Sequence, residues 1–172
     1  ARHGPAKGLS IGHAFAVCPA LDPARVLTTM ESAPPIYQKY YIKKWSRSVR
    51  VKQKCFPDRY DYDEWFALGG LRERTEYFAT RYYEFDSIDA YLDGYSVVGD
   101  RLAGLTVPTT LLTSEDDPVI PVSDALGLPV IEKLEVLTTR YGGHCAYLQN
   151  WALDSWAEQL ILSRFLAPPH AA

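Results

Sequence analysis

Three short apolar runs, each leading into polar or turn residues, predict the strands of a sheet. The run HAFAVCPALDP is nearly continuous in apolar residues and predicts a strand near residues 13–18. The run VPTTLLTSEDDP has the same form, with β-branched residues and leucines leading into acids and a proline. The run KLEVLTTRYGG is a third strand candidate, and two glycines end it. Runs of this kind are typical of strands that are buried on both faces.

Helical patterns separate and follow the last two strand candidates. The stretch IPVSDALGL is long enough for a short crossover helix. In ALDSWAEQLILSRFL the apolar side chains keep helical spacing on one face, namely Leu153, Trp156, Ala157, Leu160, Ile161 and Phe165. Residues 105–167 therefore alternate strand, helix, strand and helix. This order predicts an α/β fold, with a parallel sheet and right-handed crossovers.

A long segment, residues 23–104, interrupts this alternation. It is aromatic and charged and has no clear strand pattern, so we expect a helical insertion. Within it, one side of a helix carries basic residues and the opposite side carries mainly aromatic ones. The basic residues are Lys39, Lys43, Arg47, Arg50 and Lys54, and the opposite residues are Tyr37, Tyr41, Trp45 and Val49. The latter suit packing, although in a cap they could also line an acyl pocket.

The charges of this segment are divided between its two halves. Residues 36–56 contain seven basic residues and no acid, whereas residues 58–100 contain eleven acids and four arginines. Three interpretations of the basic helix follow. Its charges are neutralised by the acidic half, or they meet anionic lipid, or they form a nucleic-acid patch.

Composition narrows the class of protein. With 172 residues and 47% apolar residues, the chain can form a single globular core. The net charge of -3 argues against a protein whose main task is to bind nucleic acid. Cys18, Cys55 and Cys145 are an odd number without Cys-x-x-Cys spacing, so we expect a reducing, cytoplasmic location and no disulfide framework.

The most informative polar residues come directly after the last two strand candidates. Asp116 and Asp117 follow the second candidate, and His144 follows the third, 27 residues after Asp117. Because the carboxyl ends of parallel strands meet at one edge of a sheet, these side chains should project from the same edge. An acid that orients a histidine is the arrangement by which serine hydrolases activate their nucleophile.

These stretches resemble the α/β-hydrolase family, in particular its YheT-like branch. The resemblance rests on HAFAVCPALDPAR, YLDGYSVVGDRLAGLTVPTTLLTSEDDPVIP and YGGHCAYLQNW. It implies that Asp117, the aspartate before PVIP, is the triad acid and that His144 is the base. Asp116 is expected to act only in the turn. The resemblance further implies a partial hydrolase core in residues 1–22 and 105–172, with residues 23–104 as a helical cap.

The nucleophile is the part that this pattern does not supply. An α/β-hydrolase carries it in Gly-x-Ser-x-Gly between a strand and a helix, upstream of the acid. GLSIG matches with Ser10, but a strand candidate follows it where a helix is required. Ser96 in GYSVVG misses the spacing. Cys145 adjoins His144, and neighbouring side chains usually point apart.

The resemblance therefore implies the C-terminal half of a hydrolase, without initiator methionine or secretion signal, whose serine lies outside the chain. We expect the chain alone to be inactive and to need a partner, either the preceding half or a second copy, because three strands leave a sheet edge unpaired. The substrate would be a small-molecule carboxylic ester, without a cofactor. The alternative is a non-catalytic binding or oligomerisation module, and attachment to a membrane surface through the basic helix is a further option.

Histidine spacing does not predict a metal site. His3, His13 and His170 share no ligand-like spacing with one another or with the acids. His13 suits the edge of a strand instead. No substrate-binding residue is identified by these patterns.

Overall fold

The computed structural model describes residue 1 and residues 3–166, and these divide into two compact units. The first, here called the sheet unit, combines Ala1–Leu21 with the chain from Val97 onward, and the second, the helical unit, is Asp22–Ser96. Sequence patterns placed residues 97–104 in the insertion. The structure places them in the sheet unit, because Val97 donates its N–H to the Leu21 carbonyl at 2.8 Å and packs against the core of that unit.

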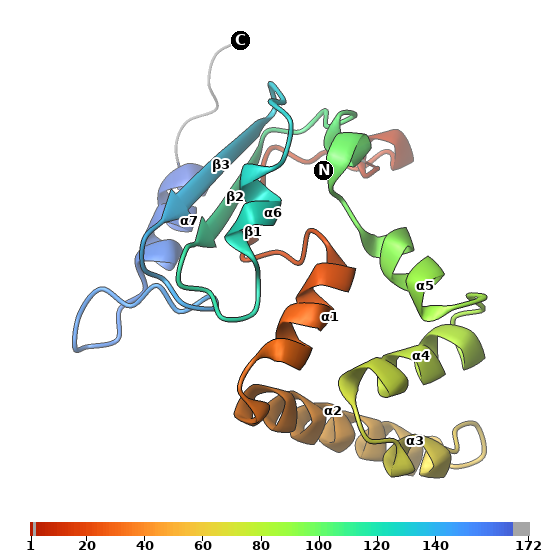
Figure 1. The fold of residues 1–172 in the computed structure, drawn as a ribbon. Helices are drawn as coiled ribbons and strands as arrows, with labels where there is room; N and C mark the ends of the chain where they lie inside the picture. The colour runs from red at the N-terminus through yellow and green to blue at the C-terminus, as the bar shows by residue number, and fades with distance from the viewer. Residues whose placement is uncertain (2, 167–172) are drawn as a thin grey trace. The chain divides into compact units, whose positions relative to one another are not determined.

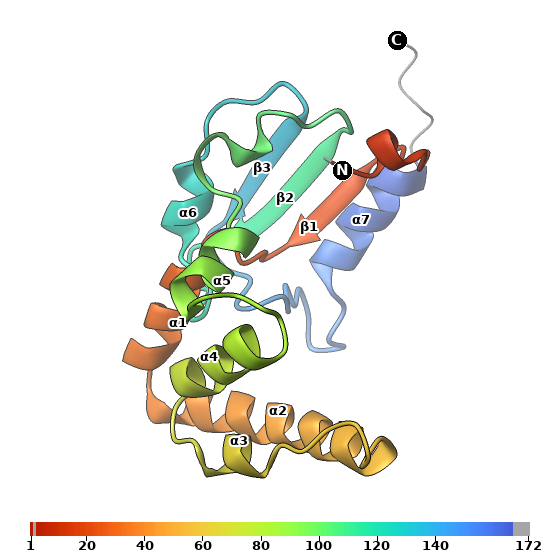
Figure 2. The same ribbon diagram turned by 90° about the vertical axis from the view of Figure 1, so that its right-hand side faces the viewer.

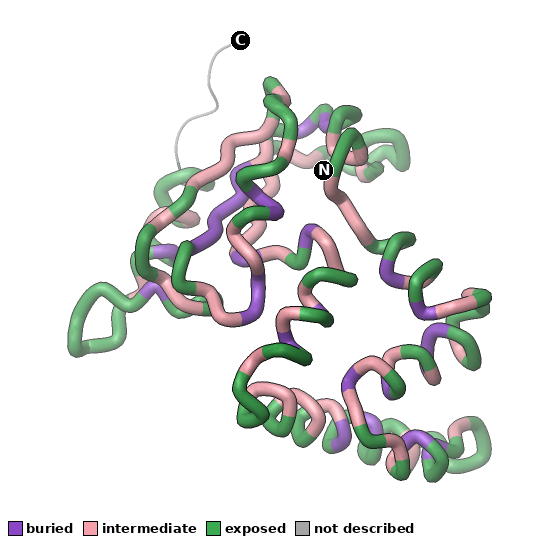
Figure 3. Tube along the Cα trace, viewed as in Figure 1, coloured by how far each residue is buried: buried purple, intermediate pink, exposed green. Residues whose placement is uncertain are grey.

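The sheet unit contains the three strands that the sequence predicts, and all of them are parallel (Figure 1). They are β1 (Ala14–Val17), β2 (Thr109–Ser114) and β3 (Leu134–Thr139), in the order β1-β2-β3. The register places Leu111 of β2 between Ala16 and Val136. The central strand is the buried one, as expected for apolar and β-branched residues with a neighbour on each side (Figure 3).

The two faces of the sheet carry different side chains, because successive strand residues alternate between faces. On one face, Leu111 packs with Leu21 and with Ala125 of α6 (Val122–Leu126). On the other face, the Thr110 hydroxyl donates to Glu135 at 2.9 Å. Glu135 in turn pairs with Arg164 of α7 (Trp156–Leu166) at 2.7 Å. The helices α6 and α7 thus lie on opposite faces (Figure 2).

The last helix begins later than its apolar spacing suggested. The expected helical face included Leu153, but Leu153 has a positive φ of 65° and is exposed. A short antiparallel bridge between Leu148 and Ser155 holds this part of the chain outside the helix. Of the residues of α7, only Ala157 is buried, so most of the apolar face remains accessible in the described part of the chain.

The helical unit consists of α1 (Pro23–Ser32), α2 (Pro35–Cys55), α3 (Asp63–Ala67), α4 (Leu71–Arg81) and α5 (Ile88–Tyr95). Two single-turn 3-10 helices, η1 (Pro5–Lys7) and η2 (Gly99–Leu102), belong to the sheet unit. The core of the helical unit is aromatic, with Tyr62 and Trp65 fully buried. Trp45 of α2 lies 5.1 Å from Trp65 and 5.5 Å from Phe78 between ring centroids, so it packs in this core.

Arg74 is a buried cation within this aromatic core. Its guanidinium lies 4.4 Å from the Trp65 ring and donates to the carbonyls of Leu68 and Phe66 at 2.6 and 3.3 Å. It also donates to the Ser46 hydroxyl at 3.3 Å. Burial lowers the pKa of Arg74 from its ordinary value. The fork of donors therefore joins α2, the α3–α4 connection and α4 into one unit.

Among the described residues, no helix is both long enough and apolar enough to cross a bilayer.

Candidate active site

The candidate site is formed by two loops at the carboxyl ends of β2 and β3. The first loop carries Asp116 and Asp117 directly after β2, and the second carries His144 after β3. Because the two strands are parallel and adjacent, both loops leave the sheet at the same edge. The sequence predicted this placement, and the geometry of the two loops specifies it further.

Asp117 and His144 are brought together by these loops. The Nδ1 atom of His144 lies 3.0 Å from Asp117 Oδ2. The Asp117 side chain is fully buried, and the His144 side chain is 33% exposed. The other oxygen, Oδ1, accepts the N–H groups of Val119 and Ile120 at 2.8 and 3.0 Å. The carboxylate is therefore fixed by the turn that follows it, with one oxygen directed to the imidazole.

This hydrogen bond determines how the histidine ring is used. An ionised carboxylate only accepts hydrogen bonds, so Nδ1 carries the proton that is shared with Asp117. In the neutral ring Nε2 then has the free lone pair. Among the described residues Nε2 has no hydrogen-bond partner. The arrangement can thus present a basic nitrogen to a group that approaches from outside the two loops.

Asp116 has a structural role that sequence patterns did not reveal. Its Oδ1 accepts the N–H groups of Gly142 and Gly143 at 2.9 and 2.8 Å. It therefore joins the loop after β3, here called the histidine loop, to the loop after β2, here called the acid loop. The hydrogen bonds from Gly143 and then Gly142 hold the pKa of Asp116 below its ordinary value, against a smaller opposing effect of desolvation. The two neighbouring acids therefore divide the work, since Asp116 holds the loop and Asp117 holds the ring.

Ser114 and Tyr147 fix the histidine loop from beneath. The Ser114 hydroxyl, fully buried at the end of β2, donates to the Gly143 carbonyl at 2.9 Å. The Tyr147 N–H donates to the Gly142 carbonyl at 2.9 Å. A Cβ on Gly142 would lie 2.4 Å from the Tyr147 ring, so the ring packs directly on this glycine. Gly143 instead adopts a φ of 56°, which disfavours other residues.

Cys18 directly follows β1, so it lies at the same end of the sheet as the two loops. Its Sγ lies 3.2 Å from the Tyr147 hydroxyl, and burial raises the pKa of the thiol to about 11. Burial also raises the pKa of Tyr147. Both groups are therefore protonated at neutral pH, and neither is an activated nucleophile.

Ser10, one of the two serines singled out in the sequence, does not join this pair. Ser10 precedes the start of β1, whereas Asp117 and His144 follow the ends of β2 and β3. The four residues of β1 alone span about 13 Å, so Ser10 lies at the opposite edge of the sheet. Ser96 ends α5 in the helical unit.

The fold also brings together potential metal ligands that spacing along the chain did not suggest. Sulfur atoms of Cys18 and Cys145 and a ring nitrogen of His144 all lie within 4.8 Å of one another. The positions of the strands could have indicated this cluster. Cys18 directly follows β1, and His144 and Cys145 follow β3, so the parallel strands bring all three to the same end of the sheet. His13 forms a hydrogen bond between its Nε2 and the Thr110 hydroxyl at 3.0 Å. His170 lies outside the described residues.

The basic side of α2 is exposed, as its spacing predicts. Lys39, Lys43, Arg47 and Lys54 are exposed, opposite the buried Val49. In the part of the chain that the structure describes, none of these four forms an ion pair. The ion pairs of the acidic half involve α4 instead, where Arg72 binds Glu31 and Arg81 binds Glu64. Direct neutralisation of the basic helix by the acidic half is therefore absent among these residues.

One curated protein supports the fold that these observations describe. Over 137 residues the chain is 27% identical to human protein ABHD15, an α/β-hydrolase domain protein, and the match covers 77% of the chain. It covers only 28% of that protein's length. No protein-family profile matches the chain, and no solved structure matches it. The likeness to ABHD15 points to the α/β-hydrolase superfamily, in agreement with the parallel sheet and its flanking helices.

Proposed function

We propose that the chain is the C-terminal part of a serine-type α/β-hydrolase of the YheT-like branch, which cleaves a carboxylic ester. The observation that carries this proposal is the hydrogen bond of 3.0 Å between His144 Nδ1 and the buried carboxylate of Asp117. It has the form of the acid and base of a Ser-His-Asp triad. The helical unit would be the cap of this enzyme. The three free cysteines favour a reducing compartment such as the cytoplasm.

In this proposal each residue has one chemical task. Nε2 of His144 removes the proton from a serine hydroxyl as that oxygen attacks the ester carbonyl. Asp117 keeps the ring in the tautomer that leaves Nε2 basic, and it stabilises the imidazolium that forms. Acyl transfer by this route requires no cofactor. The serine and the N–H groups of the oxyanion hole belong to a segment outside residues 1–172.

The unpaired side of strand β1 supports the need for such a segment. Of the described strands, β1 pairs only with β2, so its other edge offers unpaired backbone groups. Large apolar side chains of the sheet unit are also exposed, among them Leu9, Tyr141, Leu148, Trp151, Leu162, Phe165 and Leu166. A strand and helix from the preceding half of the protein would cover surface of this kind. A second copy of the chain is the alternative partner.

A fluorophosphonate probe tests the proposal, because it labels only a serine that a neighbouring base activates. The longer protein that contains this chain should be labelled at a serine outside residues 1–172. The change His144→Gln should slow this labelling by at least about 10³-fold. The isolated chain should remain unlabelled. Rapid labelling of Ser10, or labelling that His144→Gln leaves unchanged, would refute the proposal. Absence of a reactive serine from the longer protein would favour a non-catalytic binding module.

A second candidate function is attachment to anionic membranes through α2. It is favoured by the absence of ion pairs at Lys39, Lys43 and Arg47 among the described residues, and by the exposure of Ile36 and Tyr40 on the same helix. Flotation with vesicles that contain phosphatidylserine is the test. Binding that depends on the anionic lipid and is lost when the three basic residues become Glu would support it. Binding that persists in this variant would exclude the basic side of α2 as the cause.

A further inference from the structure

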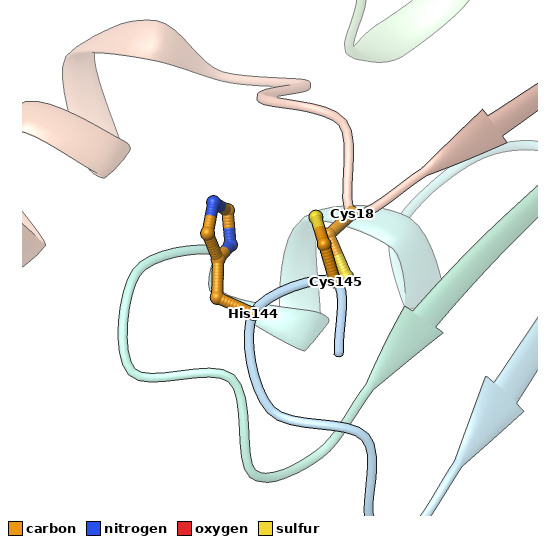
Figure 4. A group of neighbouring side chains, drawn as sticks. All are labelled: Cys18, His144 and Cys145. Atoms are coloured by element: carbon orange, nitrogen blue, oxygen red, sulfur yellow. The ribbon is translucent and has the colours of Figure 1, made fainter. Parts of the chain in front are cut away.

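The edge of the sheet that carries His144 also gathers two thiols from distant parts of the chain. Cys18 follows β1, and Cys145 lies 127 positions later, directly after His144 (Figure 4). The Cys145 thiol lies 3.8 Å from the carbonyl of Val17, which adjoins Cys18. The two sulfur atoms and one ring nitrogen of His144 all lie within 4.8 Å of one another. Two thiols and an imidazole nitrogen therefore lie close together at the carboxyl ends of the strands.

We propose that Cys18, Cys145 and His144 form a binding site for a zinc ion. Thiolate sulfur and imidazole nitrogen are the ligands that Zn²⁺ prefers, whereas Mg²⁺ and Ca²⁺ prefer oxygen. Three protein ligands leave a fourth tetrahedral position for water or an exchangeable group. The site therefore selects a soft divalent cation.

The distances fit this coordination after a small movement. Zinc–sulfur bonds of about 2.3 Å and zinc–nitrogen bonds of about 2.0 Å place tetrahedral ligand atoms about 3.5–3.8 Å apart. The three atoms here need to approach one another by about 1.3 Å at most. Rotation of the Cys145 side chain can provide this movement, since that residue is exposed.

The backbone at both cysteines adds an independent observation. Cys18 has a φ of 43° and Cys145 has a φ of 70°, a region that non-glycine residues rarely adopt. Such conformations persist only where surrounding contacts impose them, and they are concentrated at binding and active sites. Of the described non-glycine residues with positive φ, Cys18, Cys145 and Tyr147 lie at this site, and Glu84 and Leu153 lie elsewhere in the chain.

Zinc binding would release protons from the thiols. Each coordinating cysteine passes its Sγ–H proton to solvent and binds as thiolate, while His144 binds through a neutral ring nitrogen. No oxidation or reduction is involved. If the proposed hydrolase function holds, an ion on His144 would also withdraw the ring from proton transfer. The binding measurement below does not depend on that function.

The test is zinc binding by the reduced chain, measured by competition with a chromophoric chelator. We expect one zinc per chain. The changes Cys18→Ser and Cys145→Ser should each weaken binding by at least about 100-fold. Cys55→Ser is the matched control, because Cys55 ends α2 in the helical unit, and it should leave the affinity unchanged. Equal affinities of the wild-type chain and the Cys145→Ser variant would overturn the proposal.

A second measurement needs no variant and so does not depend on how a substitution affects folding. Zinc should slow alkylation of Cys145 by iodoacetamide at least tenfold while leaving alkylation of the exposed Cys55 unchanged, and Mg²⁺ should protect neither. Cobalt should give a thiolate charge-transfer band that is absent from Cys145→Ser. Alkylation of Cys145 at the same rate with and without zinc would contradict the site.

Discussion

At the scale of single residues, Gly142 and Gly143 are neighbours that are required for different reasons. Gly142 has no room for a side chain, because a Cβ would lie 2.4 Å from the Tyr147 ring. Gly143 has open space around it but a φ of 56°. The sequence predicted only that the two glycines end the third strand. The close approach could not be predicted, because it depends on where Tyr147 packs.

Alanine substitutions should separate these two requirements. We expect Gly142→Ala to lower the free energy of unfolding by about 2–3 kcal/mol through overpacking, and Gly143→Ala by about 1 kcal/mol through backbone strain. Gly12→Ala is the control, because nothing lies within 4 Å of its added Cβ, and it should be nearly neutral. Urea denaturation of the three variants measures this order. A cost for Gly143→Ala that exceeds the cost for Gly142→Ala would contradict the packing described above.

Asp116 should make the histidine loop sensitive to acid. Its pKa is lowered in the folded state, so its contribution is present above the ordinary value of 3.8 and is lost as the pH falls below that value, through the folded pKa. The amide proton shifts of Gly142 and Gly143, followed by NMR, should therefore move below about pH 4. Asp116→Asn keeps an accepting oxygen but cannot titrate there. Shifts that move equally in this variant would show that Asp116 is not the cause.

Sequence patterns predicted that Asp117 and His144 lie together, because parallel strands place their loops at one edge, and the two residues are in contact. The patterns did not identify the roles of Asp116 and Ser114, since those residues bond backbone groups of a distant loop. Backbone partners leave no trace in residue type. The cluster of Cys18, His144 and Cys145 was not predicted either, because Cys18 is far from the other two along the sequence and meets them only where the parallel strands end.

At the scale of elements, the short apolar runs predicted all three strands and the helix between the last two. Hydrophobicity is a sufficient signal for the buried central strand β2, and β1 and β3 keep the same apolar pattern although they are only partly buried. The start of α7 was wrong by several residues, because the bridge between Leu148 and Ser155 competes with the helix. The inclusion of residues 97–104 in the insertion also failed, since a backbone hydrogen bond and two valines join them to the sheet.

Arg74 should be the polar residue on which the helical unit depends most. We expect Arg74→Met to destabilise the chain by about 2–4 kcal/mol, because the Leu68 and Phe66 carbonyls lose their charged donor. Arg72→Met on the same helix is the matched control. Arg72 forms a partly exposed ion pair with Glu31, so its removal should cost less than about 1 kcal/mol. Similar melting temperatures for the two variants would contradict the role of Arg74.

At the scale of the whole molecule, the sheet unit carries an open strand edge and exposed apolar side chains. We therefore expect the isolated chain to associate at micromolar concentration, and to form a one-to-one complex when it is co-expressed with the segment encoded before it. Sedimentation velocity distinguishes these states. A chain that stays monomeric and stable across this concentration range would argue against a missing partner.

In the proposed enzyme Asp117, and not its neighbour Asp116, orients His144 for acyl transfer. The most direct test compares two substitutions in the longer protein, with kcat/KM for a p-nitrophenyl ester as the readout. We predict that Asp117→Asn lowers kcat/KM by about 10⁴-fold, because the histidine loses the partner that fixes its tautomer. Asp116→Asn keeps the acceptor for Gly142 and Gly143 and should cost less than about tenfold. Equal losses in the two variants, or a larger loss in Asp116→Asn, would contradict the claim.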